Sequence, residues 1–283
     1  MKSDLYALSA IVLWATLAPL GVALSHVPPF LLTGIALLIG SLIALPLSGF
    51  RLAAWKVPWL TLALGIYGLF GFHLLLFLAL RHAPAVEANL INYLWPLGMV
   101  VLAPLFLPGM RLRGAHVGAA LLGFGGAVIA IVGRGQGGMS AGFYPGYLFA
   151  FGSAFVWSSY SLATRRVAHF ETAAVGSFAL VSGLLALLFH FLLEPAVHFV
   201  ASDWVRICVL GLGPLGGAFF LWDAAIKAGD PRRIGVFAFL TPLLSTLLLV
   251  LTTGQEFHAS IVLAAAMIIG AAAWCQRTTE SAN

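Results

Sequence analysis

Ten mostly apolar stretches, each about 20 residues long, occupy most of this 283-residue chain. An α-helix rises about 1.5 Å per residue, so about 20 residues cross the ~30 Å hydrocarbon core of a bilayer. No water is available there to the backbone, so each stretch must satisfy its own hydrogen bonds, as a helix does. The sequence therefore predicts an all-α membrane protein of ten transmembrane helices. We place them at 5–24, 29–49, 58–80, 84–107, 114–133, 145–165, 172–193, 205–226, 231–252 and 259–276.

The composition excludes a soluble domain and a nucleic-acid partner. Hydrophobic residues make up 61% of the chain and charged residues 8%, whereas soluble domains carry about 25% charged residues. The basic residues occur in ones and twos between apolar spans and form no patch for nucleic acid. Cys208 and Cys275 both lie inside apolar stretches, so we expect neither a disulfide framework nor a metal site, and no cofactor.

The basic residues are unequally shared between the two sides of the predicted bundle. The side of the N-terminus carries 11 of them: Lys2, Arg51, Lys56, Arg111, Arg113, Arg165, Arg166, Lys227, Arg232, Arg233 and Arg277. The other side carries 3: Arg81, Arg134 and Arg206. Because short cytoplasmic loops are enriched in Lys and Arg, we expect both termini to be cytoplasmic.

The two halves of the chain resemble each other. Residues 79–96 align without a gap to 225–242, and the same offset pairs glycines upstream. The identical pairs are Ala79 and Ala225, Leu94 and Leu240, Pro96 and Pro242, Gly65 and Gly211, and Gly71 and Gly217. Each half holds five spans, an odd number, so the second half must enter the membrane from the opposite side. We therefore expect an inverted repeat, residues 1–136 and 137–283, around a central cavity at the bilayer midplane.

Four residues of the fourth span fall three or four positions apart. Asn89, Asn92, Tyr93 and Pro96 would share one face of a continuous helix. Since an amide facing lipid is costly, this face suggests a wet cavity that binds substrate. The alternative is that both amides hold neighbouring helices together.

Two tryptophans lie near the middle of their spans rather than at the membrane surface, where tryptophan is usual. Trp14 and Trp157 occupy comparable positions in the two halves, and Tyr160 follows Trp157 by three residues. These rings could wall a pocket for an apolar or aromatic side chain or for an ammonium group. Core packing is the alternative for each ring.

Pro96 and Pro242 occupy matching mid-span positions. Each removes a backbone hydrogen bond, so we expect a kink in spans four and nine. Such kinks would serve packing or would open the cavity.

Three ionisable residues within spans have two interpretations each. Asp223 is a candidate proton or charge site, or it pairs with Lys227 one turn later. His73 is a candidate proton relay, or it bonds to a neighbouring helix. Glu87 is a candidate gate residue, or it complements the dipole at the start of its helix.

Several motifs resemble a known family. AIVLWAT at 10–16, AVEANLINYLWP at 85–96, FVWSSY at 155–160 and FLTPLLST at 239–246 resemble EamA-type transporters of the drug/metabolite transporter superfamily, and most of all the YddG-type amino acid exporters of bacterial inner membranes. The resemblance implies a basket-like bundle in which spans 1, 3, 4, 6, 8 and 9 surround the cavity. It also implies a multi-pass protein of the cell inner membrane that exports aromatic and other neutral amino acids. A neutral polar residue would be expected at Asp223.

These observations predict a secondary transporter that exports amino acids by alternating access, with the lipid bilayer and a small-molecule substrate as its partners and a monomer as its functional unit. A multidrug or other metabolite exporter with the same fold is the first alternative. A membrane-embedded enzyme or a helical adaptor is the distant one. An enzyme would need acid–base residues converging at one depth, whereas Asp223, Glu87 and His73 fall at three depths, so we expect no catalytic residues.

Overall fold

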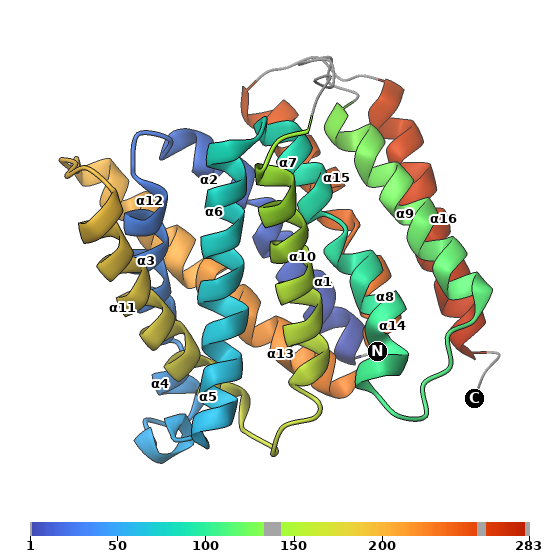
Figure 1. Cartoon of the computed structure of the whole chain (residues 1–283), viewed down its shortest axis with the longest axis horizontal. Helices are drawn as coiled ribbons and strands as arrows, with labels where there is room; N and C mark the ends of the chain where they lie inside the picture. The colour runs from blue at the N-terminus through green and yellow to red at the C-terminus, as the bar shows by residue number, and fades with distance from the viewer. Residues whose placement is uncertain (1, 133–142, 254–258, 281–283) are drawn as a thin grey trace.

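The computed structural model describes residues 2–132, 143–253 and 259–280. Within these ranges every element is helical, and the helices run roughly side by side in one bundle (Figure 1). The start of α1 and the end of α16 lie at the same end of the bundle (Figure 1). The expected boundary between the two repeats, at residues 136 and 137, lies outside the described residues.

Most predicted spans correspond to one or two helices, with short helical segments between them. In chain order these are α1 (Lys2–Ala15), α2 (Leu17–Ala23), α3 (Pro29–Ser41), α4 (Ala44–Leu47), η1 (Leu52–Trp55), α5 (Trp59–Ile66), η2 (Tyr67–Gly71), α6 (Phe72–His82), α7 (Ala85–Asn92), α8 (Trp95–Phe106), α9 (Gly114–Val132), α10 (Gly146–Ala163), η3 (Thr172–Ala174), α11 (Val175–Leu193), α12 (Ala201–Leu212), η4 (Gly213–Gly217), α13 (Ala218–Ala228), α14 (Pro231–Phe237), α15 (Leu240–Thr253) and α16 (Ala259–Glu280).

Nine helical stretches of the described chain are long and apolar enough to cross a membrane. The predicted sixth span, α10, is not among them, although it is 18 residues long. Its run of Ser158, Ser159, Tyr160 and Ser161 lowers its mean hydropathy, and the same four residues are buried. Because α10 packs between α6 and α8, protein rather than lipid surrounds these polar groups.

Prolines determine where several helices begin. Pro29 and Pro231 are the first residues of α3 and α14, and Pro84 immediately precedes α7. The first turn of a helix needs no donor from its own N–H groups, so proline costs little there. These three starts agree with the sequence prediction.

Two spans contain a π-helical segment at matching positions. η2 covers Tyr67–Gly71 and η4 covers Gly213–Gly217, and both ends differ by 146 residues, the offset of the sequence repeat. A π segment inserts extra backbone into a helix and often marks a functional position. The third and eighth spans are therefore both altered halfway along their length.

Glycine allows a close approach between the two halves of the chain. A Cβ atom on Gly40 of α3 would lie 2.7 Å from the Cα of Gly216 in η4 and 2.8 Å from the carbonyl oxygen of Gly211 in α12. No larger residue fits between backbones that are so close, which is how small residues promote helix packing in membranes.

Candidate functional site

Four tryptophans from four spans meet at the centre of the bundle. Trp14 of α1, Trp95 of α8, Trp157 of α10 and Trp222 of α13 form what we call the tryptophan cluster. Ring centroids lie 5.0 Å apart for Trp14 and Trp222, 5.8 Å for Trp14 and Trp157, and 5.4 Å for Trp95 and Trp222. Most of these contacts are edge-to-face, an arrangement that stabilises an aromatic pair by about 0.5–1.5 kcal/mol beyond burial.

Further rings extend the tryptophan cluster. Trp157 also contacts Tyr160 on its own helix at 5.4 Å, Phe72 of α6 at 5.4 Å and Phe219 of α13 at 5.5 Å between centroids. The predicted contact of Trp157 with Tyr160, and the proximity of Trp14, are therefore present. All four tryptophans are at most 8% exposed, so the rings are buried against one another in this conformation.

Sequence reasoning missed Trp95, Trp222, Phe72 and Phe219. Trp95 lies inside the NYLWP motif, and Trp222 immediately precedes Asp223, so both are next to predicted site residues. For Trp95 the mid-span position was the available signal, because it is the same signal that identified Trp14 and Trp157, whereas Trp222 lies nearer the end of its span.

Some ring contacts join residues that match between the two halves. His73 and Phe219 differ by 146 residues, the offset of the repeat, and their ring centroids lie 6.3 Å apart. Trp14 and Trp157, which occupy comparable positions in their spans, are 5.8 Å apart. Two equivalent residues can touch only near the axis that relates them, so these contacts lie where such an axis would pass.

Asn92 is buried beside α10. Its Oδ1 accepts a hydrogen bond of 2.8 Å from the hydroxyl of Ser153, and the residue is 6% exposed. This bond joins two helices, as the structural alternative for the amide expected. It leaves the NH₂ group of the side chain as a donor for other partners.

The expected helical face of the fourth span is interrupted after Tyr93. α7 ends at Asn92 and α8 begins at Trp95, although Tyr93 still donates its N–H to the carbonyl of Asn89 at 2.9 Å. Asn89 and Tyr93 are half-buried, and the described ring contacts do not include Tyr93. The physical reason is Pro96, which cannot donate to the carbonyl of Asn92 and so interrupts the helix one turn before itself.

Pro242 has the same effect in the ninth span. α14 ends at Phe237 and α15 begins at Leu240, so the interruption again precedes the proline. The expected kinks are therefore present as two-residue interruptions of the helix in both spans. Thr241 donates its N–H to the carbonyl of Ala238 at 3.0 Å, which satisfies the oxygen that Pro242 cannot reach.

Two of the ionisable candidates have local partners. Glu87 lies in the first turn of α7, as expected, and accepts a hydrogen bond from the hydroxyl of Tyr147 in α10. The imidazole of His73 bonds through Nδ1 to the carbonyl of Leu69 at 2.6 Å, so the expected bond to a neighbouring helix is wrong. The π segment explains this, because Leu69 lies within η2 one turn before His73.

Asp223 forms the expected ion pair. Its Oδ2 lies 2.6 Å from the Nζ of Lys227, and the hydroxyl of Thr172 donates to the same oxygen at 2.7 Å. Lys227 also donates to the carbonyl of Phe170 at 2.9 Å. The carboxylate is thus held at the end of the bundle where Arg111, Arg165 and Arg232 also lie.

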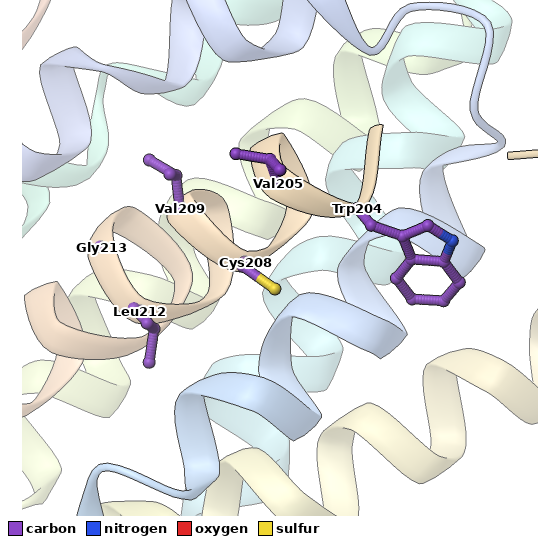
Figure 2. A pocket seen from close by; sticks show the side chains of 6 residues that line it. All are labelled: Trp204, Val205, Cys208, Val209, Leu212 and Gly213. Atoms are coloured by element: carbon purple, nitrogen blue, oxygen red, sulfur yellow. The ribbon is translucent and has the colours of Figure 1, made fainter. Parts of the chain in front are cut away.

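An open groove on the outer face of α12 differs from the tryptophan cluster, because its lining is exposed and uncharged. It is lined by Trp204, Val205, Cys208, Val209, Leu212 and Gly213 (Figure 2). Trp204 is 47% exposed and Val205 65%, and the lining offers no charged group. This surface suits lipid chains, so the candidate substrate site is the tryptophan cluster.

Comparison with known proteins identifies relatives over the whole chain. Residues 1–132 and 144–275 each match the EamA-like transporter family. The chain is 43% identical over 276 residues to the aromatic amino acid exporter YddG of Ancylobacter novellus, covering 96% of both proteins. It is 28% identical over 298 residues to the aromatic amino acid exporter YddG of Escherichia coli K12, covering 99% of this chain and 98% of that protein. A crystal structure 41% identical in sequence superposes with a TM-score of 0.89 and covers 97% of both chains.

Proposed function

The chain belongs to the EamA-like transporter family, and from this premise we propose that it exports aromatic and other neutral amino acids across a bacterial inner membrane. The observation that carries the proposal is the tryptophan cluster, in which rings from four spans meet at a buried centre. The two exporters described above match nearly all of the chain and are named for aromatic amino acids, whose side chains such a cluster fits.

The substrate side chain binds among the rings of Trp14, Trp157 and Tyr160. Aromatic rings attract one another through edge-to-face and offset contacts and also hold aliphatic side chains by burial. The NH₂ group of Asn92 donates to the substrate carboxylate. A site of rings and amides gives modest affinity and accepts several neutral amino acids.

We propose that the protein is built from two five-helix repeats of opposite orientation, with ten spans in all. Three observations support this architecture: the two family matches at 1–132 and 144–275, the π segments offset by 146 residues, and the helix interruptions before Pro96 and Pro242. α10, the sixth span in chain order, is counted with the nine more apolar stretches because its polar groups face protein.

The altered helices support alternating access. Between Asn92 and Trp95, between Phe237 and Leu240, and within η2 and η4, the backbone bonding departs from the regular pattern that keeps a helix straight. Bending there separates the buried rings and exposes the site to one side at a time. The excess of basic residues on one side supports an orientation with both termini in the cytoplasm.

The proposal is tested by counterflow with purified protein in proteoliposomes. Vesicles preloaded with unlabelled phenylalanine should accumulate labelled phenylalanine, tyrosine and leucine, while cationic dyes should not move. Dye movement without any exchange of amino acids would replace the amino acid exporter with a multidrug exporter.

A further inference from the structure

The Asp223–Lys227 ion pair retains an unused acceptor and an unused donor. Asp223 is 4% exposed, and among the described residues its buried Oδ1 has no hydrogen-bond partner. The Lys227 ammonium carries three N–H donors, and two are used by Asp223 and by the carbonyl of Phe170. A buried carboxylate oxygen without a donor is costly, so Oδ1 is an acceptor available to a ligand.

The contacts of the Lys227 ammonium show which groups near Asp223 can bind an ammonium. Its Nζ contacts the carboxylate of Asp223 at 2.6 Å and the carbonyl of Phe170 at 2.9 Å, and it lies 3.6 Å from the centroid of the Phe170 ring. Carboxylate, carbonyl and ring face are the three groups that recognise an ammonium.

The ion pair lies beside the tryptophan cluster. Asp223 directly follows Trp222 on α13, and the Trp222 ring contacts Trp14 and Trp95. The pair thus begins one residue from a member of the tryptophan cluster, and it lies on the side of the bundle that carries most of the basic residues. A ligand with an aromatic end and a dipolar end could occupy both places at once.

We propose that Asp223 and Lys227 together bind the zwitterionic backbone of the amino acid, with the substrate ammonium on Oδ1 of Asp223 and the substrate carboxylate on Nζ of Lys227. This inference rests on the proposed function and explains how an otherwise apolar site selects amino acids over other apolar molecules. The ion pair stays formed, so no net charge is moved into the membrane when the zwitterion binds.

The test measures binding of labelled phenylalanine to purified protein and its competition by two analogues. Phenylethylamine retains the ammonium and lacks the carboxylate, whereas 3-phenylpropionate retains the carboxylate and lacks the ammonium. The wild-type protein should bind phenylalanine more tightly than either analogue, by about tenfold for each lost charged hydrogen bond.

Two single variants should change the analogue preference in opposite directions. Asp223→Asn should weaken phenylalanine and phenylethylamine about tenfold and leave 3-phenylpropionate unchanged, so that the preference for an ammonium disappears. Lys227→Gln should weaken phenylalanine and 3-phenylpropionate and leave phenylethylamine unchanged. A purely structural ion pair would instead weaken all three probes equally in both variants, and that result would overturn the inference.

A double variant and a matched control keep the test decisive if a single variant does not fold. The double variant Asp223→Asn/Lys227→Gln leaves no uncompensated charge and should bind phenylalanine and 3-phenylpropionate with equal affinity, because Asn92 still donates to the carboxylate of both; a retained preference for phenylalanine over 3-phenylpropionate would contradict the inference. The matched control is the exposed pair Arg51 and Glu171, 3.4 Å apart, whose variants Arg51→Gln and Glu171→Gln should keep the wild-type preference.

If the wild-type protein neither binds nor exchanges phenylalanine, the proposed function itself fails. If it does both but the variants do not change the analogue preference as expected, only this inference fails.

Discussion

The indole rings of Trp14 and Trp222 lie 5.0 Å apart between centroids, with their planes tilted by 52°. This contact joins α1 to α13, two helices that pack along each other. Trp222 is fixed from the other side, because its Nε1–H donates to the hydroxyl of Ser161 on α10 at 3.0 Å. Three spans therefore hold one ring pair, and any opening of the centre must separate them.

Replacing Trp157 by Ala should lower the exchange of phenylalanine. The variant lacks one of the rings proposed to hold the substrate, and at about 0.5–1.5 kcal/mol for an aromatic contact with phenylalanine we expect a few-fold to about tenfold lower counterflow rate. The control is Trp59→Ala, because Trp59 is 77% exposed on the bundle surface. Wild-type kinetics in a folded Trp157→Ala protein would remove Trp157 from the site.

Replacing Asn92 by Ala should raise the KM for phenylalanine with a smaller change in maximal rate. The amide NH₂ is the proposed donor to the substrate carboxylate, and losing one charge-assisted hydrogen bond costs about 1.5–3 kcal/mol. Ser153→Ala, which removes only the hydroxyl that positions Asn92, should raise KM less. Equal effects of the two variants would indicate that Asn92 only holds helices together.

Replacing Gly68 by Ala should destabilise the protein, because a Cβ atom there would overlap the ring of Tyr160. Overpacking of this kind costs about 1–3 kcal/mol, which thermal unfolding in detergent would detect. Gly21→Ala is the matched control, since nothing lies within 4 Å of its added Cβ. A Gly68→Ala protein as stable as the control would mean that Tyr160 moves aside without cost.

The stabilising effect of Asp230 should depend on pH. Burial acts to raise the pKa of Asp230, but its hydrogen bonds and ion pair with Arg232 together lower that pKa below its usual value. A lowered folded-state pKa means that the charged group stabilises the fold at pH values above the unfolded pKa of about 3.9, and that this stabilisation is lost as the pH falls through the folded value.

The measurement compares thermal unfolding of the wild type with Asp230→Asn from pH 7 to pH 3. Asn can still accept the hydrogen bond from the N–H of Arg232 at the start of α14, so the variant removes mainly the charge. We expect a constant difference above about pH 5 that shrinks at lower pH. A difference that grows with acidity would contradict the lowered pKa.

The sequence predicted the positions of the helical spans well, because apolar length and proline placement are local properties. It also predicted the proximity of Trp14, Trp157 and Tyr160 and the pairing of Asp223 with Lys227. It could not predict that Trp95 and Trp222 complete the cluster, because their meeting depends on how distant spans pack. The polar face expected for span four is interrupted because Pro96 cannot donate a backbone hydrogen bond. The π segments could not be predicted either, because no simple residue pattern marks them.

The central claim, that the tryptophan cluster binds the substrate ring, is tested most directly by fluorescence quenching. A variant with Trp55, Trp59, Trp204 and Trp274 replaced by Phe keeps only the four clustered tryptophans of the eight in the chain. Addition of 4-nitrophenylalanine, whose nitro ring quenches indole emission on contact, should reduce this emission saturably, and excess phenylalanine should restore it. Unchanged emission at nitrophenylalanine concentrations that saturate its exchange in proteoliposomes would contradict the account.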